Sequence, residues 1–301
     1  MCGIVGLFCK SPELEPRLGE HLAAMLEQMS DRGPDSAGVA VYRDPAPSGS
    51  SKLTLYSFDP DMSWDGLRAE LATMFGAADE AGVRANHAVF VVDGEADDVE
   101  DWLRRHRPDV RVMSAGRAIE IYKEVGRPQA FVLQFGLGDI EGSHGLGHTR
   151  MATESRVTTE GSHPFSTGLD LCLVHNGSLS NHNRLRERLR REGIDFQTEN
   201  DTEVAAGYLT WRMREGASLQ EALEGALSDL DGFYTFLVGT ADGFAVLRDP
   251  IACKPAVLAE TDDWVAMSSE YRAIAVLPGA SDARLWEPEP SVVYAWEKAL
   301  V

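Results

Sequence analysis

The chain is poor in cysteine, in positive charge and in long apolar runs. Four cysteines occur in 301 residues, and they are scattered without a CxxC pair, so the sequence indicates neither a disulfide framework nor a thiolate cluster. Lysine and arginine total 28 against 48 acidic residues, which gives a formal net charge of −20. Because duplex nucleic acid and anionic membranes select positive surfaces, neither is an expected partner.

The shortage of apolar runs bears on location. No stretch of the sequence approaches the ~20 apolar residues of a membrane-spanning helix. The N-terminus carries no basic region, and its apolar stretch, 4–8, is too short for the core of a signal peptide. The apolar fraction of 44% and the charged fraction of 25% are those of a globular protein, and we expect a cytoplasmic, reducing location.

Apolar periodicity predicts an α+β protein. Residues 4–9 form a continuous apolar run typical of a buried strand, and apolar residues spaced three and four apart predict a helix over 14–29. Further short strands separated by tight turns follow along the chain, with helices before, between and after them. This pattern favours two antiparallel sheets whose outer faces are covered by helices.

An inserted unit is predicted after the first strands. Residues 61–128 contain their own helices and strands but no residue with an obvious chemical role, so we expect a small α/β insertion on the surface there. Periodicity predicts one helix over 64–82 and a strand over 129–136.

Cys2 follows the initiator methionine and precedes an apolar strand. The initiator is expected to be removed when the second residue is small, and the product then carries a thiol and a free α-amine on one residue. An α-amine with a pKa of ~7.7–8.0 accepts a proton near neutral pH, so it can serve as the base for the neighbouring thiol. The alternative is a small apolar strand residue, since free cysteine is commonly buried.

Two polar segments carry further candidates. Arg150 lies in GHTRMAT, 147–153, where it could grip a carboxylate with two parallel hydrogen bonds or form an ordinary surface salt bridge. Asn176 and Gly177 can supply two N–H donors to the oxyanion that develops when an amide carbonyl is attacked. The alternative for this Asn-Gly pair is a hairpin turn.

Asp201 lies in the segment NDTE, 200–203, and could bind an ammonium group. A capping box at the start of a helix explains Asn200 and Glu203 without any function. The functional and the structural interpretation of this segment are both open at this point.

Two pairs of residues have spacings that suit zinc ligands, His144 with His148 and Cys172 with His175. The first pair lies in a glycine-rich rather than a helical segment, so its spacing guarantees no shared face. We therefore expect no metal site.

Taken in order, these segments resemble the class II glutamine amidotransferases, whose members are N-terminal-nucleophile hydrolases. The resemblance covers nearly the whole chain apart from the insertion. It implies one amidotransferase domain over 1–301, folded as a four-layer αββα sandwich of two antiparallel sheets. It rests on MCGIVG at 1–6, RGPDSAG at 32–38, GHTRMAT at 147–153, HPF at 163–165, HNG at 175–177, NDTE at 200–203, RDPIACKP at 248–255 and SSEYRAI at 268–274.

The resemblance also implies a role for each candidate residue. The nucleophile would be Cys2, with its α-amine as the general base, and the oxyanion hole would be formed by Asn176 and Gly177. The α-carboxylate of glutamine would bind Arg150, and its α-amino group would bind Asp201. Thr153 is implied as a further contact to glutamine. Two supporting residues are implied as well, Arg32 beside the nucleophile and His163 holding its loop.

The implied reaction is hydrolysis of L-glutamine to glutamate and ammonia through a γ-glutamyl thioester on Cys2. The sequence has no glycine-rich phosphate loop and no iron–sulfur cysteine spacing, so we expect no cofactor on this chain. Its overall form most resembles the stand-alone amidotransferase subunit of glutamate-synthase-like complexes, including N-methylglutamate synthase. There, a separate synthase subunit would use the ammonia, and FMN and an iron–sulfur cluster would belong to partner subunits.

Two other functions are open on the sequence alone. If Met1 is retained, the base becomes a peptide nitrogen that cannot accept a proton, and the chain would be a structural or regulatory subunit that keeps the fold. The other is an N-terminal-cysteine amidase acting on a different amide, which would not need both Arg150 and Asp201 for amino-acid recognition. Loss of the initiator distinguishes the enzyme from the structural subunit.

Overall fold

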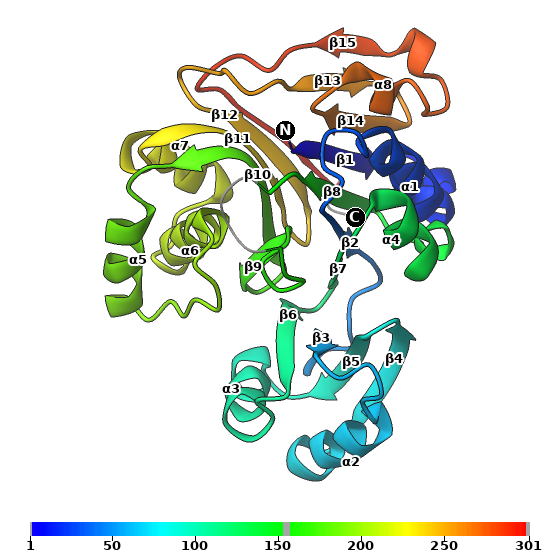
Figure 1. The fold of residues 1–301 in the computed structure, drawn as a ribbon, viewed down its shortest axis with the longest axis vertical. Helices are drawn as coiled ribbons and strands as arrows, with labels where there is room; N and C mark the ends of the chain where they lie inside the picture. Colours follow the sequence, from blue (N-terminus) through cyan, green and yellow to red (C-terminus); the bar gives the residue numbers. More distant parts are fainter. Residues whose placement is uncertain (1, 153–156, 299–301) are drawn as a thin grey trace.

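Two antiparallel sheets form the centre of the molecule (Figure 1). The computed structural model describes residues 2–152 and 157–298. The first sheet has the strand order β15 (Arg284–Trp286), β13 (Val257–Glu260), β14 (Trp264–Ser268), β1 (Gly3–Cys9), β8 (His144–Arg150), β2 (Ser36–Tyr42) and β7 (Ile119–Val125). The second has the order β16 (Val293–Glu297), β12 (Gly243–Arg248), β11 (Gly232–Gly239), β10 (Leu171–Leu179) and β9 (Phe165–Gly168).

Strand β1 contributes apolar side chains to both faces of the first sheet. Val5 lies in the core cluster between the first sheet and its outer helices, whereas Ile4 lies in the cluster between the two sheets. Successive side chains of a strand point to opposite faces, so a run without polar residues is buried on both. Gly6 allows the sheets to approach, because a Cβ there would be 2.6 Å from Leu237 Cδ2.

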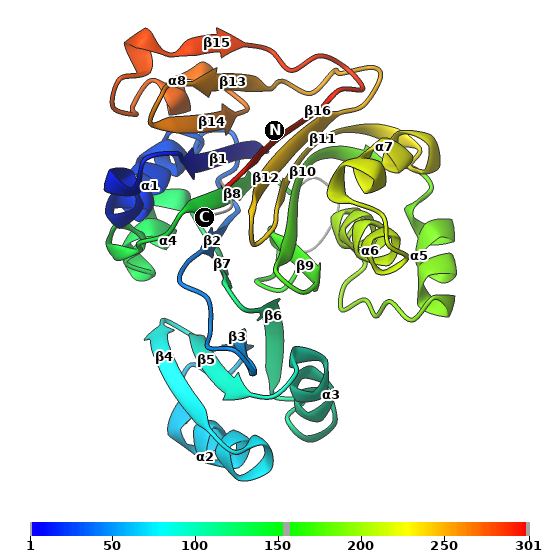
Figure 2. The ribbon, with the colours of Figure 1, turned by 180° about the vertical axis from the view of Figure 1, so that it is seen from behind.

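Helices cover the outer face of each sheet, as the two opposite views show (Figures 1 and 2). Apolar clusters fill the space between the sheets and the space under each helix layer. The predicted four-layer αββα sandwich is therefore confirmed. Among the described residues, no helix is both long and apolar enough to span a membrane. The helices are α1 (Leu18–Gln28), α4 (Pro128–Gln134) and α8 (Tyr271–Ile274) on the first sheet, and α5 (His182–Arg191), α6 (Asp201–Arg214) and α7 (Leu219–Asp229) on the second.

The insertion forms a separate four-stranded sheet with its own apolar core (Figure 1). Its predicted bounds, 61–128, differ from the structure at both ends, because the strand at 50–57 joins the inserted sheet and the strand at 119–125 joins the first sheet. Both strands alternate in the ordinary way, and the sheet that such a strand joins depends on partners distant in sequence. The elements of the unit are β3 (Ser50–Ser57), α2 (Trp64–Phe75), β4 (Ala78–Arg84), β5 (His87–Asp93), α3 (Ala96–His106) and β6 (Val110–Gly116).

Two predictions of secondary structure were wrong. Residues 129–136, predicted as a strand, lie largely in helix α4, because Pro128 is preset for the first helical turn and Phe131 and Phe135 both pack into the core. The helix predicted over 64–82 ends early: Gly76, with a φ of +110°, follows α2, and the chain then forms strand β4.

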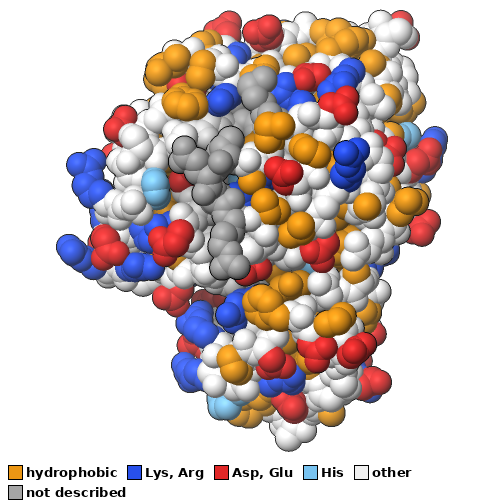
Figure 3. Space-filling view, viewed as in Figure 1, with side chains coloured by type: hydrophobic (Ala, Val, Ile, Leu, Met, Phe, Trp, Pro, Cys, Tyr) orange, Lys and Arg blue, Asp and Glu red, His pale blue; other side chains and the backbone are white. Residues whose placement is uncertain are grey.

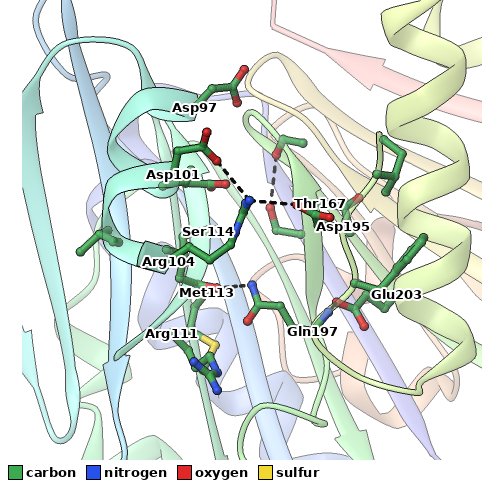
Figure 4. A pocket seen from close by; sticks show the side chains of 18 of the residues that line it. Asp97, Asp101, Arg104, Arg111, Met113, Ser114, Thr167, Asp195, Gln197 and Glu203 are labelled. Atoms are coloured by element: carbon green, nitrogen blue, oxygen red, sulfur yellow. Dashed lines mark hydrogen bonds and ion pairs between the residues drawn. The ribbon is translucent and has the colours of Figure 1, made fainter. Parts of the chain in front are cut away.

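A cavity of about 650 Å³ lies between the inserted unit and the second sheet (Figures 3 and 4). Arg104 of α3 crosses it, with Nη1 3.1 Å from Asp101 and 2.9 Å from Asp195. Beside this ion pair, Gln197 donates from Nε2 to the carbonyl oxygen of Val112 at 3.2 Å. These polar contacts join the inserted unit to the segment between α5 and α6.

Candidate active site

Cys2 is placed by strand β1, which begins at the next residue. Gly3 pairs with Thr149 of β8, and this antiparallel register sets Cys2 beside Arg150. The Cys2 side chain is partly exposed, and its Sγ lies 3.8 Å from the carbonyl oxygen of Met151. A fully buried strand cysteine, the structural alternative for Cys2, is therefore not what the fold contains.

The backbone of Cys2 is held by two side chains from distant parts of the chain. Arg32 donates from Nε to the Cys2 carbonyl oxygen at 3.0 Å, and Asn176 donates from Nδ2 to the same oxygen at 3.2 Å. Arg32 is itself fixed by an ion pair with Glu270 at 2.5 Å. These contacts come from three segments that are distant in sequence. The position of the Cys2 backbone, and with it that of the thiol, therefore depends on the tertiary fold.

Asn176 and Gly177 lie inside strand β10, where they pair with Thr235 and Tyr234 of β11. The hairpin turn considered for this pair is thereby excluded. Gly177 has a φ of +146°, and a Cβ there would be 1.9 Å from the carbonyl oxygen of Phe233, so the position requires glycine.

The Asn176 amide points toward Cys2 and is aligned by a neighbouring hydroxyl. Its Nδ2 also donates to Ser269 Oγ at 3.0 Å, and the same Oγ accepts a hydrogen bond from Ile4 N at 2.9 Å. The side chain is 4% exposed. Such a fixed N–H donor beside a thiol suits stabilisation of a developing oxyanion.

Arg150 is the last residue of strand β8. Its side chain is 7% exposed, and Nη1 donates to the carbonyl oxygen of Gly161 at 3.2 Å. Arg150 is therefore a buried side chain and not a surface one. A guanidinium is a planar fork of N–H donors that matches the geometry of a carboxylate.

Asp201 begins helix α6. Its Oδ2 accepts a hydrogen bond from Leu179 N at 2.9 Å, which ties the helix start to strand β10, the strand that carries Asn176. The side chain is partly exposed, and Oδ1 lies 3.9 Å from His175 Nδ1. Oδ2 thus forms a structural hydrogen bond. The partly exposed carboxylate can still bind an ammonium group.

The predicted capping box at 200–203 is only half formed. Asn200 caps α6, since its side chain accepts a hydrogen bond from Thr202 N at 2.9 Å. Glu203 turns instead to the preceding loop, where its carboxylate accepts from Gln197 N at 2.7 Å and Thr198 N at 2.8 Å. Helix capping therefore explains the presence of Asn200. It does not involve the side chain of Asp201.

His163 lies in the interior next to these groups. Its ring stacks on His148 with centroids 4.0 Å apart, and its Nε2 is 3.2 Å from Thr202 Oγ1. Burial lowers the pKa of His148 to about 3 and that of His163 well below its ordinary value. Both rings are therefore neutral near pH 7, which permits their close stacking, and His163 links its loop to α6.

Sequence reasoning missed three residues that build the site. Ser269 and Glu270 follow strand β14 and hold Asn176 and Arg32, as described above. Asp35 accepts a hydrogen bond from Ala152 N at 2.8 Å and thereby fixes the chain just after Arg150. Polar residues directly after a buried strand, as in Ser269-Glu270, were the available signal. Thr153, the predicted glutamine contact, lies outside the described residues.

The residues weighed as zinc ligands are used within the fold. His144 stacks on Tyr42 and its Nε2 lies 2.8 Å from the carbonyl oxygen of Thr240, while His148 Nε2 lies 3.2 Å from the carbonyl oxygen of His175. Within residues 2–152 and 157–298, no three histidine, cysteine or acidic side chains are grouped so that they could hold a metal ion.

Comparison with known proteins places this chain in a family. A family model described as a glutamine amidotransferase domain matches residues 148–276. The glutamine amidotransferase-like protein GlxB of Rhizobium meliloti is 58% identical over 298 residues, which make up 99% of this chain and 98% of that protein. The chain belongs to the class II glutamine amidotransferases.

More distant relatives of this amidotransferase are about twice as long as the region that matches this chain. The amidophosphoribosyltransferase of Archaeoglobus fulgidus is 27% identical over 93% of this chain, but the match spans 45% of that protein. The structure of glutamine phosphoribosylpyrophosphate amidotransferase from B. subtilis superposes with a TM-score of 0.61 at 20% identity, over 98% of this chain and 49% of the other. The second comparison shows the shared N-terminal-nucleophile hydrolase fold.

This amidotransferase is an enzyme of the glutaminase class, whose reaction needs a nucleophile, oxyanion donors and groups that recognise an amino acid. The fold brings Cys2, Arg32, Arg150 and Asn176 together through direct contacts or a shared register. Asp201 joins them through strand β10. By contrast, the 650 Å³ cavity beside the inserted unit is lined by none of the predicted site residues.

Proposed function

We propose that Cys2 is the nucleophile of a glutamine-hydrolysing centre and that Asn176 and Gly177 supply its oxyanion hole. The observation that carries this proposal is the convergence of Arg32 Nε and Asn176 Nδ2 on the backbone of Cys2, at 3.0 and 3.2 Å. An amide donor held beside a partly exposed thiol is the arrangement that acyl transfer requires.

The chemistry proceeds in two halves after removal of Met1. The α-amine of Cys2 takes the thiol proton, and Sγ attacks Cδ of the glutamine side chain to give a tetrahedral oxyanion. The C–N bond breaks as the α-ammonium returns the proton to the leaving nitrogen, which departs as ammonia. Water then attacks the γ-glutamyl thioester, the C–S bond breaks, and glutamate and the free thiol are restored.

Substrate recognition follows from charge. The guanidinium of Arg150 binds the α-carboxylate, and the carboxylate of Asp201 binds the α-ammonium group. Arg32 and His163 hold the surrounding backbone, Arg32 at Cys2 and His163 at the start of α6. Thr153 is proposed to contact glutamine on the ground of the family resemblance alone.

The ammonia is proposed to pass to a separate synthase subunit of a glutamate-synthase-like or N-methylglutamate synthase complex in the cytoplasm. FMN and an iron–sulfur cluster would then reside on the partner subunits, with no cofactor on this chain. The support is the sequence resemblance to the amidotransferase subunit of such complexes. Co-purification of this chain with flavin- and iron-containing subunits tests the assignment, and isolation of the chain without any such partner contradicts it.

The catalytic proposal is tested by glutamine hydrolysis in two cysteine variants. Cys2→Ala should release no glutamate, whereas Cys253→Ala, at an exposed cysteine, should match the wild-type rate. Unchanged hydrolysis in Cys2→Ala would refute the proposal. A folded wild-type chain that retains Met1 and hydrolyses no glutamine would instead identify a structural or regulatory subunit.

A further inference from the structure

Lys123 is a buried lysine that the glutaminase chemistry does not use. It lies on strand β7 and is 4% exposed. Its Nζ donates to three backbone carbonyl oxygens of one segment, those of Glu160 at 3.1 Å, Ser162 at 3.0 Å and Pro164 at 3.2 Å. An ammonium group has three N–H donors, so this cradle matches the protonated form of the side chain.

The carbonyl between these acceptors belongs to the recognition site. Lys123 binds the carbonyls on both sides of Gly161, and the Gly161 oxygen accepts hydrogen bonds from Arg150 Nη1 at 3.2 Å and Asn200 Nδ2 at 3.4 Å. Asn200 in turn caps helix α6, whose first residue is Asp201. The Gly161 carbonyl oxygen therefore contacts both sides of the recognition site. It binds the Arg150 guanidinium directly, and it binds Asn200, the residue before Asp201.

The segment 160–164 also packs closely against strand β2, beside Lys123. A Cβ on Gly38 of β2 would be 2.2 Å from the carbonyl oxygen of His163 and 2.7 Å from the Cβ of Lys123. The ring of Phe165 lies 4.6 Å from the Lys123 ammonium, which adds a cation–π contact. Little freedom is left to the segment as long as the ammonium holds its three carbonyls.

We propose that Lys123 is a positioning residue for glutamine recognition: it fixes the carbonyls around Gly161 and thereby the guanidinium of Arg150 and the start of α6. This inference rests on the proposed function, because Arg150 and Asp201 are assigned there to the substrate. It adds a residue from the strand next to the inserted unit to the set that determines affinity for glutamine.

The charge state of Lys123 follows from its surroundings. Burial lowers its pKa to about 8, although the carboxylates of Glu203 on α6 and Glu160 on the segment oppose this shift. The histidines that face it, His163 of the segment and His87 of β5, have pKa values lowered by burial and are neutral near pH 7 and above. Loss of the Lys123 proton leaves two N–H donors for three carbonyls, so glutamine binding is expected to weaken as pH rises through about 8.

The test compares Lys123→Met with Lys52→Met. Lys52 is a matched control, because it is 6% exposed and its Nζ binds Glu120 at 3.3 Å and the Asp44 carbonyl at 2.8 Å, away from the segment. For L-glutamine, Lys123→Met should raise KM about 10-fold while kcat changes less than about threefold, and Lys52→Met should leave both near wild type. Equal KM values in the two variants would overturn the proposal.

A substrate without the α-carboxylate separates positioning from general damage. 4-Aminobutanamide cannot use Arg150 but keeps the ammonium group assigned to Asp201, so Lys123→Met should lose less efficiency on it than on L-glutamine. Equal losses on both substrates would overturn the positioning role. A wild-type chain that hydrolyses neither substrate would refute the proposed function rather than the role of Lys123 in holding the segment.

Hydrogen exchange reports on the segment without any assay of activity. Amides of 157–165 should exchange faster in Lys123→Met than in Lys52→Met, and unchanged protection would contradict the inference. If Lys123→Met does not fold, hydrogen exchange of the wild-type chain at different pH values tests the same inference. After correction for the intrinsic effect of pH on exchange, protection of 157–165 should fall between pH 7 and pH 9 while that of β10 is retained, and constant protection would contradict the inference.

Discussion

Replacing Asn176 with alanine tests the oxyanion hole most selectively. The side chain donates from Nδ2 to the Cys2 carbonyl oxygen at 3.2 Å and to Ser269 Oγ at 3.0 Å, which holds its amide next to the proposed nucleophile. Removal of one oxyanion donor costs about 10²–10³-fold in kcat, or about 2.7–4 kcal/mol of transition-state stabilisation. We therefore expect kcat to fall by that factor.

The KM for glutamine should change little in Asn176→Ala, because Arg150 and Asp201 lie on other elements and keep their own hydrogen bonds. The free energy of unfolding should drop by about 1–3 kcal/mol, since one buried and one partly buried hydrogen bond are lost. Asn181→Ala is the control: it removes a bond from Nδ2 to the Asp229 carbonyl at 2.9 Å on the outer helix layer.

Initial rates of glutamate release over a range of glutamine concentrations separate these effects. Asn181→Ala should keep the wild-type kcat even if it loses some stability. If Asn176→Ala is folded and its kcat lies within about threefold of the wild type, the assignment of Asn176 to the oxyanion hole is refuted.

Two further predictions follow from backbone geometry and from charge. Gly177→Ala should lower Tm and abolish hydrolysis, because a Cβ at a φ of +146° would overlap the Phe233 carbonyl; a wild-type melting curve would contradict this reasoning. Glu100 lines the cavity beside the inserted unit, and burial raises its pKa to about 7. The native state then binds more protons than the unfolded chain between about pH 4.5 and 7, so this carboxyl makes the protein less stable as pH rises through that window. Glu100→Gln should reduce that fall in denaturation experiments, and an identical pH profile would contradict the raised pKa of Glu100.

The sandwich was predictable because its strands carry a local signal. The apolar run at 4–9 and the alternation of later strands specify two sheets with covered faces. The boundary of the insertion was not predictable, because Ser50–Ser57 and Ile119–Val125 look alike locally and differ in which partners they meet. Strand β8 carries little local signal for a related reason, since its glycines and histidines have low apolar periodicity and it is ordered by pairing with β1 and β2.

The candidate residues of the site were predictable as an ordered set, but their supports were not. Cys2, Arg150, Asn176 and Asp201 stand in recognisable segments, whereas Ser269 and Glu270 act only through groups that are distant in sequence. The structural alternative for Asn176 failed for a physical reason, because an Asn-Gly pair with partners in β11 is no turn. Arg150, at 7% exposure, does not lie on the surface as its polar segment suggested.

The central claim is that removal of Met1 turns Cys2 into a nucleophile with its own base. Intact-mass spectrometry of the purified chain, before and after reaction with an electrophilic analogue of glutamine, tests it directly. We expect a mass that lacks the initiator methionine, followed by a single adduct that peptide mapping locates at Cys2 and that excess L-glutamine suppresses. A chain that retains Met1 and stays unmodified, or an adduct on Cys253 instead, would contradict this mechanism.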